Sequence, residues 1–153
     1  MELIKTNKEL KEACKTLSKA KFITIDTEFI REKTYWSQLC LIQVCSGELE
    51  LIIDPLEEEI DLTPFIKILN KKSILKILHS GRQDIEIFYK ISGKIPYPIF
   101  DTQIAAMVCG FGDSVGYEKL VDKVLRKKID KSSRFSNWAK RPLTKKQLNY
   151  AIG

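Results

Sequence analysis

Phe22-Ile-Thr-Ile-Asp-Thr-Glu-Phe29 is the stretch around which the fold is organised. Its apolar residues predict a buried strand over 21–29 that ends in acidic residues. Asp26 and Glu28 are two positions apart, so both side chains leave the same face of that strand. Neighbouring carboxylates repel each other, and a fold tolerates them where a divalent cation lies between them. Taken alone, the pair is equally consistent with two solvated acids at a strand end.

The surrounding sequence predicts an α/β fold. Strands are predicted over 38–45, 49–54, 74–79 and 99–100. Helices are predicted over 6–20, 63–70, 81–91, 101–108 and 116–126, with Thr6 and Asp101 as N-caps and a capping box at Thr144 that opens a last helix. This order predicts a mixed five-stranded sheet, a three-strand antiparallel meander plus parallel strands, flanked by helices.

The composition is that of one globular domain. Of 153 residues, 44% are hydrophobic and 30% charged, which suits one apolar core and not two. No apolar run approaches the ~20 residues that a membrane-spanning helix needs, and the N-terminus has no secretory signal pattern. The four cysteines form no C-x-x-C pair and there is one histidine. A zinc cluster is therefore disfavoured, and a reducing cytoplasm is the expected location.

The positive charge is concentrated in the last quarter of the chain. Residues 118–153 contain 11 Lys/Arg and 3 Asp/Glu, whereas the first 117 contain 15 and 17. Such a surface is either a solvated basic face or a binding face for a polyanion. Charge alone favours the first interpretation.

Asp84 adds a third carboxylate from a distant part of the sequence. It lies in the first turns of the helix predicted after the strand at 74–79. Sites in α/β sheets gather at strand ends, so Asp84 can face Asp26 and Glu28. Alternatively it only balances the helix dipole, at under ~1 kcal/mol.

A series of short motifs runs through nearly the whole chain. In order they are Phe22–Phe29, Gln38-Leu-Cys-Leu-Ile-Gln-Val44, His79-Ser-Gly-Arg-Gln-Asp-Ile-Glu-Ile-Phe88, Phe100-Asp-Thr-Gln-Ile-Ala-Ala106, Trp138-Ala-Lys-Arg-Pro-Leu-Thr144 and Leu148-Asn-Tyr-Ala-Ile-Gly153. This series resembles the ribonuclease D branch of the DEDD 3′→5′ exonucleases, a family with a ribonuclease H-like fold.

The resemblance implies a single 3′→5′ exonuclease domain over 1–153. It also implies two divalent ions, Mg²⁺ or Mn²⁺, held by Asp26, Glu28 and Asp84, with Tyr150 orienting the attacking water. The expected substrate is RNA, in particular structured precursors of the tRNA type, and the expected products are 5′-nucleotides. Single-stranded DNA is the alternative substrate.

Further residues near these motifs are candidates for contact with the nucleic acid. Some border the first acids, where contact with the nucleic acid and packing within the protein are equal alternatives. Others belong to the basic C-terminal region, where phosphate contact or loop anchoring is expected. The candidates are Thr27, Phe29, Gln43, Lys131, Arg134 and Trp138. Together with the resemblance, they favour the polyanion-binding interpretation of the basic region.

The third motif departs from the family pattern. The family has a fourth carboxylate four residues after the tyrosine, one helical turn on. Counted from Tyr150, this is position 154, outside the 153 residues. The sequence thus predicts a domain truncated within its last helix, and a catalytically impaired nucleic-acid-binding remnant is the alternative to an active enzyme.

His79 offers a second alternative. His79 and Asp84 have the spacing found in the histidine branch of the DEDD nucleases, where the histidine acts as base and Tyr150 would be idle. That pair belongs to the last motif of the family, however, and 69 residues follow Asp84 here. The tyrosine branch is therefore favoured.

Overall fold

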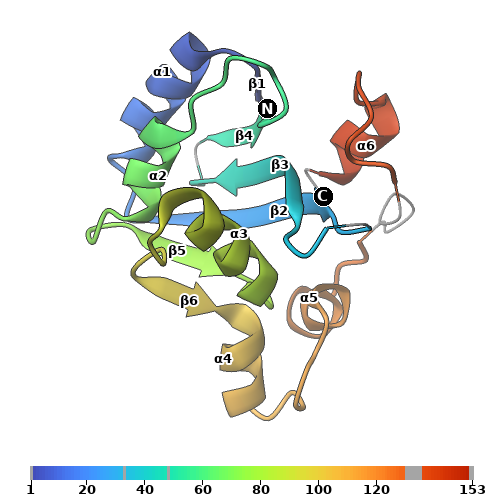
Figure 1. Ribbon diagram of the computed structural model, residues 1–153. Coiled ribbons are helices and arrows are strands. Elements are labelled where there is room, and N and C mark those ends of the chain that lie inside the picture. Colours follow the sequence, from blue (N-terminus) through green and yellow to red (C-terminus); the bar gives the residue numbers. More distant parts are fainter. Residues whose placement is uncertain (1, 33, 48, 130–135, 152–153) are drawn as a thin grey trace.

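The computed structural model describes residues 2–32, 34–47, 49–129 and 136–151 (Figure 1). In these ranges one sheet has six strands, in the order β1-β4-β3-β2-β5-β6. The strands are β1 (Glu2–Ile4), β2 (Phe22–Ile30), β3 (Gln38–Cys45), β4 (Glu50–Ile53), β5 (Leu75–Leu78) and β6 (Ile99–Asp101). The helices are α1 (Asn7–Leu17), α2 (Thr63–Leu69), α3 (Arg82–Ser92), α4 (Thr102–Val108), α5 (Tyr117–Leu125) and α6 (Lys145–Tyr150).

The predicted mixed sheet is confirmed, with one correction to the number of strands. β2 pairs antiparallel with β3 and parallel with β5, and β4 pairs antiparallel with β3. The prediction of five strands is wrong, because β1 adds a sixth that pairs in parallel with β4. A three-residue edge strand is too short to show a hydrophobic period, and only its partner strand defines it.

Helices α1, α2 and α3 cover one face of the sheet. Leu10 and Leu17 of α1 are completely buried, as is Ile23 of β2, and Phe65 of α2 and Phe88 of α3 join the same apolar cluster. Each such side chain contributes about 1.5–3 kcal/mol by leaving water. This face therefore supplies most of the apolar stabilisation.

A second, smaller cluster lies on the opposite face of the sheet. Cys40, Leu41 and Ile52 pack there against Trp138, which is 2% exposed. Residues 136–151, which include α6, cover this face, and Figure 1 shows α6 across the sheet from α1 and α2. The two faces of β2 thus meet different parts of the chain.

One ion pair fastens the C-terminal segment to this second face. Arg141 Nε and Nη2 donate to the two carboxylate oxygens of Asp54, both at 2.6 Å, and the Asp54 side chain is completely buried. Arg141 also donates to the backbone carbonyls of Cys40 and Trp138, at 2.8 and 2.7 Å. A bidentate arginine–carboxylate pair fixes orientation as well as distance, so Arg141 sets where the segment before α6 lies.

The predicted helix starts are confirmed where side chains cap them. Thr6 and Thr144 each form a capping box, and Asp101 caps α4 through Gln103 N. These caps follow from local sequence alone, because they satisfy backbone N–H groups within one turn. None of the helices in the described part of the chain combines the length and apolar character needed to cross a membrane.

Candidate active site

Asp26 and Glu28 lie on the face of β2 that the C-terminal segment covers. Strand register places Gln43 of β3 opposite Asp26, and Leu41 opposite Glu28. The Gln43 side chain lies close enough to the Glu28 carboxylate to lower the pKa of that carboxyl. Gln43 is therefore a neighbour of both acids of β2.

Asp84 reaches β2 from its edge. β5 pairs with β2 only as far as Thr24, and α3 begins four residues after β5 ends. The Thr27 hydroxyl donates a short hydrogen bond to Asp84 Oδ1, and both side chains are buried. Past Thr24, α3 thus takes the place of β5 beside β2 and brings the third acid to the first two.

The tight turn between β5 and α3 requires a glycine. A Cβ atom on Gly81 would lie 2.7 Å from Leu78 Cβ, a distance that side chains do not tolerate. The Asp101 carboxylate accepts from the backbone N–H groups of Ser80 and Gly81, at 3.0 and 2.9 Å. Asp101 was predicted only as an N-cap, and it also holds the turn that positions Asp84.

Burial raises the pKa values of all three acids, and a neighbouring carboxylate raises those of Asp26 and Glu28 further. Burial by the surrounding protein, and then the Asp84 carboxylate, raise the pKa of Asp26 to about 7, although one side of Asp26 stays open to solvent. Burial, and then Asp26, raise the pKa of Glu28 to about 8. Burial also raises the pKa of Asp84, against the lowering effect of the Thr27 hydrogen bond. Such carboxylates are ionised more easily when a cation lies among them.

The chemistry of these side chains fits Mg²⁺ or Mn²⁺, which prefer oxygen ligands. Among the residues that the structure describes, however, no three His, Cys, Asp or Glu side chains lie close enough to form a ready-made metal site. Asp84 is hydrogen-bonded to Thr27. The backbone therefore brings the acids into one neighbourhood, and a cation held by all three would require their side chains to move closer together.

Tyr150 lies on the same sheet face as Asp26 and Glu28. Its ring packs on Trp138, with centroids 5.8 Å apart, in the cluster that contains Leu41. Because Leu41 is the cross-strand partner of Glu28, α6 brings Tyr150 to the neighbourhood of the acids. Trp138 itself is buried, so it anchors this segment and offers no exposed ring surface to a base.

The other predicted contacts with nucleic acid have different placements. Thr27 is 6% exposed, and its hydroxyl donates to Asp84. Phe29 is half-buried against the larger apolar cluster. Lys131 and Arg134 lie outside the described residues. His79 Nδ1 lies 2.9 Å from Thr102 Oγ1, and its ring contacts Tyr117.

The ion pair of Arg141 with Asp54 was not predicted. Both residues were visible in the sequence, Arg141 within a motif and Asp54 directly after an apolar strand. An aspartate at a buried strand end demands a cationic partner. Nothing in the sequence shows that the partner stands 87 positions later.

Comparison with known proteins assigns the family. The sequence pattern of a family described as 3′-5′ exonuclease matches residues 1–153. The chain belongs to this family. Its match to a ribonuclease D of Bartonella henselae is 51% identical over 152 residues, and that to a ribonuclease D of Nitrobacter hamburgensis is 48% identical. Both alignments cover 99% of this chain.

The fold is also that of a solved member of this exonuclease family. Escherichia coli RNase D, described as an exoribonuclease involved in structured RNA processing, superposes with a TM-score of 0.94 at 40% identity, over 99% of this chain. The ribonuclease D-type fold expected from the motifs is therefore confirmed. The chain spans 37–40% of the length of these two curated relatives and 40% of the E. coli chain.

Proposed function

We propose that these residues form the catalytic part of a metal-dependent 3′→5′ exoribonuclease that releases 5′-nucleotides from RNA. The observation that carries the proposal is the convergence of Asp26 and Glu28 from β2 with Asp84 from α3, in a chain of the 3′-5′ exonuclease family. The raised pKa values of all three acids support it, since this is the pattern of a carboxylate site built for cations.

Each residue has a proposed role. Asp26, Glu28 and Asp84 hold two divalent ions, Mg²⁺ or Mn²⁺, which when bound lower the pKa of the attacking water and offset the charge on the reacting phosphate. Tyr150 orients that water. Gln43 and Thr27 act through the acids, by holding Glu28 and Asp84 respectively.

RNA is the proposed substrate, processed in the cytoplasm. The description of E. coli RNase D as an exoribonuclease supports RNA as the substrate, and the basic composition of residues 118–153 supports a polyanionic one. Lys131 and Arg134 are proposed phosphate contacts, where Coulomb attraction gives affinity without sequence preference. The matching single-stranded DNA tests the alternative, since an enzyme that reads the 2′-hydroxyl discriminates against it.

The test is trimming of a 5′-labelled RNA in the presence of Mn²⁺. The 153-residue chain is compared with a form that carries an added aspartate at position 154. We expect 3′→5′ trimming that is much faster in the extended form, and that Asp26→Asn abolishes. Asp113→Asn removes an exposed acid and serves as the matched control. Trimming that survives Asp26→Asn would overturn the proposal.

Calorimetric titration with Mn²⁺ separates the enzyme from a catalytically impaired remnant. Two binding sites that are lost in Asp26→Asn support an enzyme. One weak site or none, in both the 153-residue and the extended forms, favours the remnant, in which the fold and the basic surface persist without the chemistry.

A further inference from the structure

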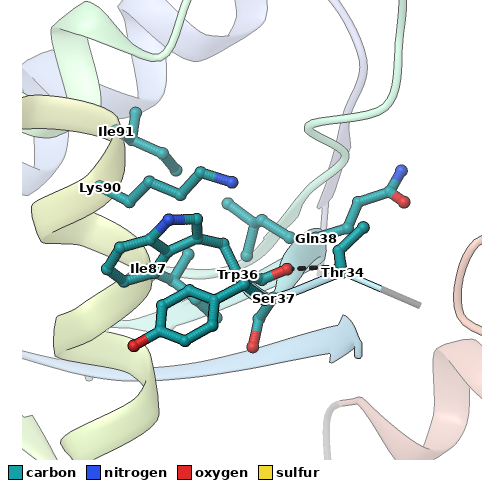
Figure 2. A pocket seen from close by; sticks show the side chains of 9 residues that line it. Thr34, Trp36, Ser37, Gln38, Ile87, Lys90 and Ile91 are labelled. Carbon is teal, nitrogen blue, oxygen red and sulfur yellow. Dashed lines mark hydrogen bonds between the residues drawn. The ribbon is translucent and has the colours of Figure 1, made fainter. Parts of the chain in front are cut away.

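A hollow of about 430 Å³ lies between α3 and the segment that connects β2 to β3 (Figure 2). Its volume is within the range of small-ligand pockets. Figure 2 shows Trp36 on the wall from the connecting segment, and Ile87, Lys90 and Ile91 on the wall from α3. The full lining is Thr34, Tyr35, Trp36, Ser37, Gln38, Leu39, Ile87, Lys90 and Ile91.

The hollow combines exposed aromatic rings with positive charge. Tyr35 is 77% exposed and Trp36 46%, and their rings meet edge to face at 5.2 Å. The Arg31 guanidinium lies over the Tyr35 ring, 5.9 Å from its centre, and Lys90 lines the opposite wall. Exposed rings next to cations are the pattern by which proteins stack nucleobases and hold the phosphates between them.

The hollow lies one helical turn from Asp84, the acid that α3 carries. Asp84, Ile87 and Ile91 follow one another at helical spacing, so they share one face of α3. Lys90 is six residues beyond Asp84, about 9 Å along the helix axis. The other wall begins at Thr34, four residues after β2 ends at Ile30, so it belongs to the segment that follows the strand of Asp26 and Glu28. A single strand with its 3′ end at the acids therefore has a short path into the hollow.

We propose that this hollow binds an unpaired nucleotide of the RNA substrate, upstream of the bond that is cut. The base stacks on Trp36, and Lys90 contacts a phosphate. The inference rests on the proposed exonuclease function and deepens it: the hollow admits single-stranded RNA rather than duplex, because the faces of a base within a duplex are covered by the neighbouring base pairs.

Tryptophan fluorescence tests the stacking contact directly. The chain has two tryptophans, Trp36 at 46% exposure and Trp138 at 2%. Titration with an unpaired oligoribonucleotide, in EDTA so that no cleavage occurs, should quench the emission of the wild-type chain. In Trp36→Phe only the buried indole remains, and we expect no quenching although RNA still binds. Equal quenching in Trp36→Phe would overturn the stacking contact.

Affinity for the same oligonucleotide, measured by fluorescence anisotropy, tests the two contacts separately. Trp36→Ala should weaken binding by about 5- to 160-fold, the range for loss of one base–aromatic stack. Lys90→Met should reduce the slope of log affinity against log salt by about 1. Tyr89→Ala and Lys94→Met are the matched controls: both side chains are exposed and close in sequence, and neither lines the hollow.

The outcomes distinguish this inference from the proposed function. If the chain trims RNA, and Trp36→Ala and Lys90→Met bind it as well as their controls do, the subsite is wrong and the enzyme stands. If the chain never trims RNA but quenching is lost in Trp36→Phe and affinity falls in Trp36→Ala, the proposed function is wrong and the RNA-binding hollow stands.

Discussion

The two faces of the sheet are held in different ways. On the face under α1, α2 and α3, the described residues include nineteen buried members of one apolar cluster. On the face under residues 136–151 the corresponding cluster has four, and the Arg141–Asp54 ion pair provides the specific attachment. The first face distributes its stability over many buried side chains, whereas the second combines a small buried cluster with one polar pair in the segment that leads to Tyr150.

Alternate side chains of β2 point to the two faces of the sheet. Ile23, Ile25 and Thr27 point to the apolar face, and Asp26 and Glu28 to the other. The apolar side fixes the strand rigidly, so the acids on the other side are held in place although they repel each other. A rigid scaffold behind strained polar groups is what a preorganised site requires.

Loss of the ion pair should have the largest effect. Arg141→Met leaves the Asp54 carboxylate buried without a counterion, which costs about 3–5 kcal/mol of unfolding free energy. Urea unfolding measures it, and Trp138 emission should shift to the red because its segment loosens. Lys140→Met, an exposed neighbour, is the control. The double variant Asp54→Leu with Arg141→Met should recover part of the loss, and equal stability of Arg141→Met and Lys140→Met would contradict the comparison.

A cavity on the apolar face should lower the unfolding free energy slightly less than loss of the ion pair does. Leu10→Ala empties a completely buried position and should cost about 3 kcal/mol. The native emission of Trp138 should stay unchanged in this variant, because the cavity lies on the opposite side of the sheet. A red-shifted native spectrum in Leu10→Ala would show that the two faces are coupled rather than separate.

A substitution at Thr27 tests the hydrogen bond that joins the apolar face to the candidate site. Thr27→Val keeps the shape and removes the hydroxyl that donates to Asp84, which should cost about 1–2 kcal/mol in unfolding free energy. Thr24→Val, an exposed position on the same strand, is the matched control. If both variants lose the same stability in urea unfolding, the hydrogen bond to Asp84 contributes nothing specific.

The smallest expected effect is the pH dependence that the acids cause. The pKa values of Asp26 and Glu28 are raised to about 7 and 8 in the folded chain, so folding binds protons between pH 4 and 8. Stability of the metal-free protein should therefore fall over this range as pH rises. Solvent contact moderates the effect, because water screens the repulsion.

The double variant Asp26→Asn with Glu28→Gln isolates this contribution. We expect its advantage in unfolding free energy over the wild type, in EDTA, to be larger at pH 8 than at pH 5. Addition of Mn²⁺ at pH 8 should stabilise the wild type alone. A difference between the two proteins that does not change with pH would contradict the raised pKa values.

Much of the fold could be predicted because its signals are local. The strand at 38–45 was predicted with its bounds, and the caps at Thr6, Asp101 and Thr144 were correct, since each depends on residues within one turn. β1 was missed because pairing with β4 defines it. Lys76 is the clearest contrast: it looks like a solvated lysine in a strand, yet it is completely buried.

The contacts of Lys76 explain why its burial could not be predicted from the sequence. Its ammonium group donates to the backbone carbonyls of Lys71, Ile74 and Tyr97 at 2.7–2.8 Å, and burial lowers the pKa of this lysine to about 8. These acceptors come from two loops, one of them some twenty residues away. A buried charge is tolerated only with such partners, and partners from another loop cannot be read from the strand itself.

The sequence by itself determined the family motifs, the α/β order and the candidate acids Asp26, Glu28 and Asp84, because spacing along a strand and helix is a local property. Only the tertiary structure showed that the Thr27 hydroxyl meets Asp84, that the Gln43 side chain lies near Glu28 and that Trp138 is buried. It also joined Arg141 to Asp54 and placed Trp36 opposite Lys90. The pairs of Thr27 with Asp84, of Arg141 with Asp54 and of Trp36 with Lys90 each close a long loop of chain, and only packing of the whole domain brings such residues together.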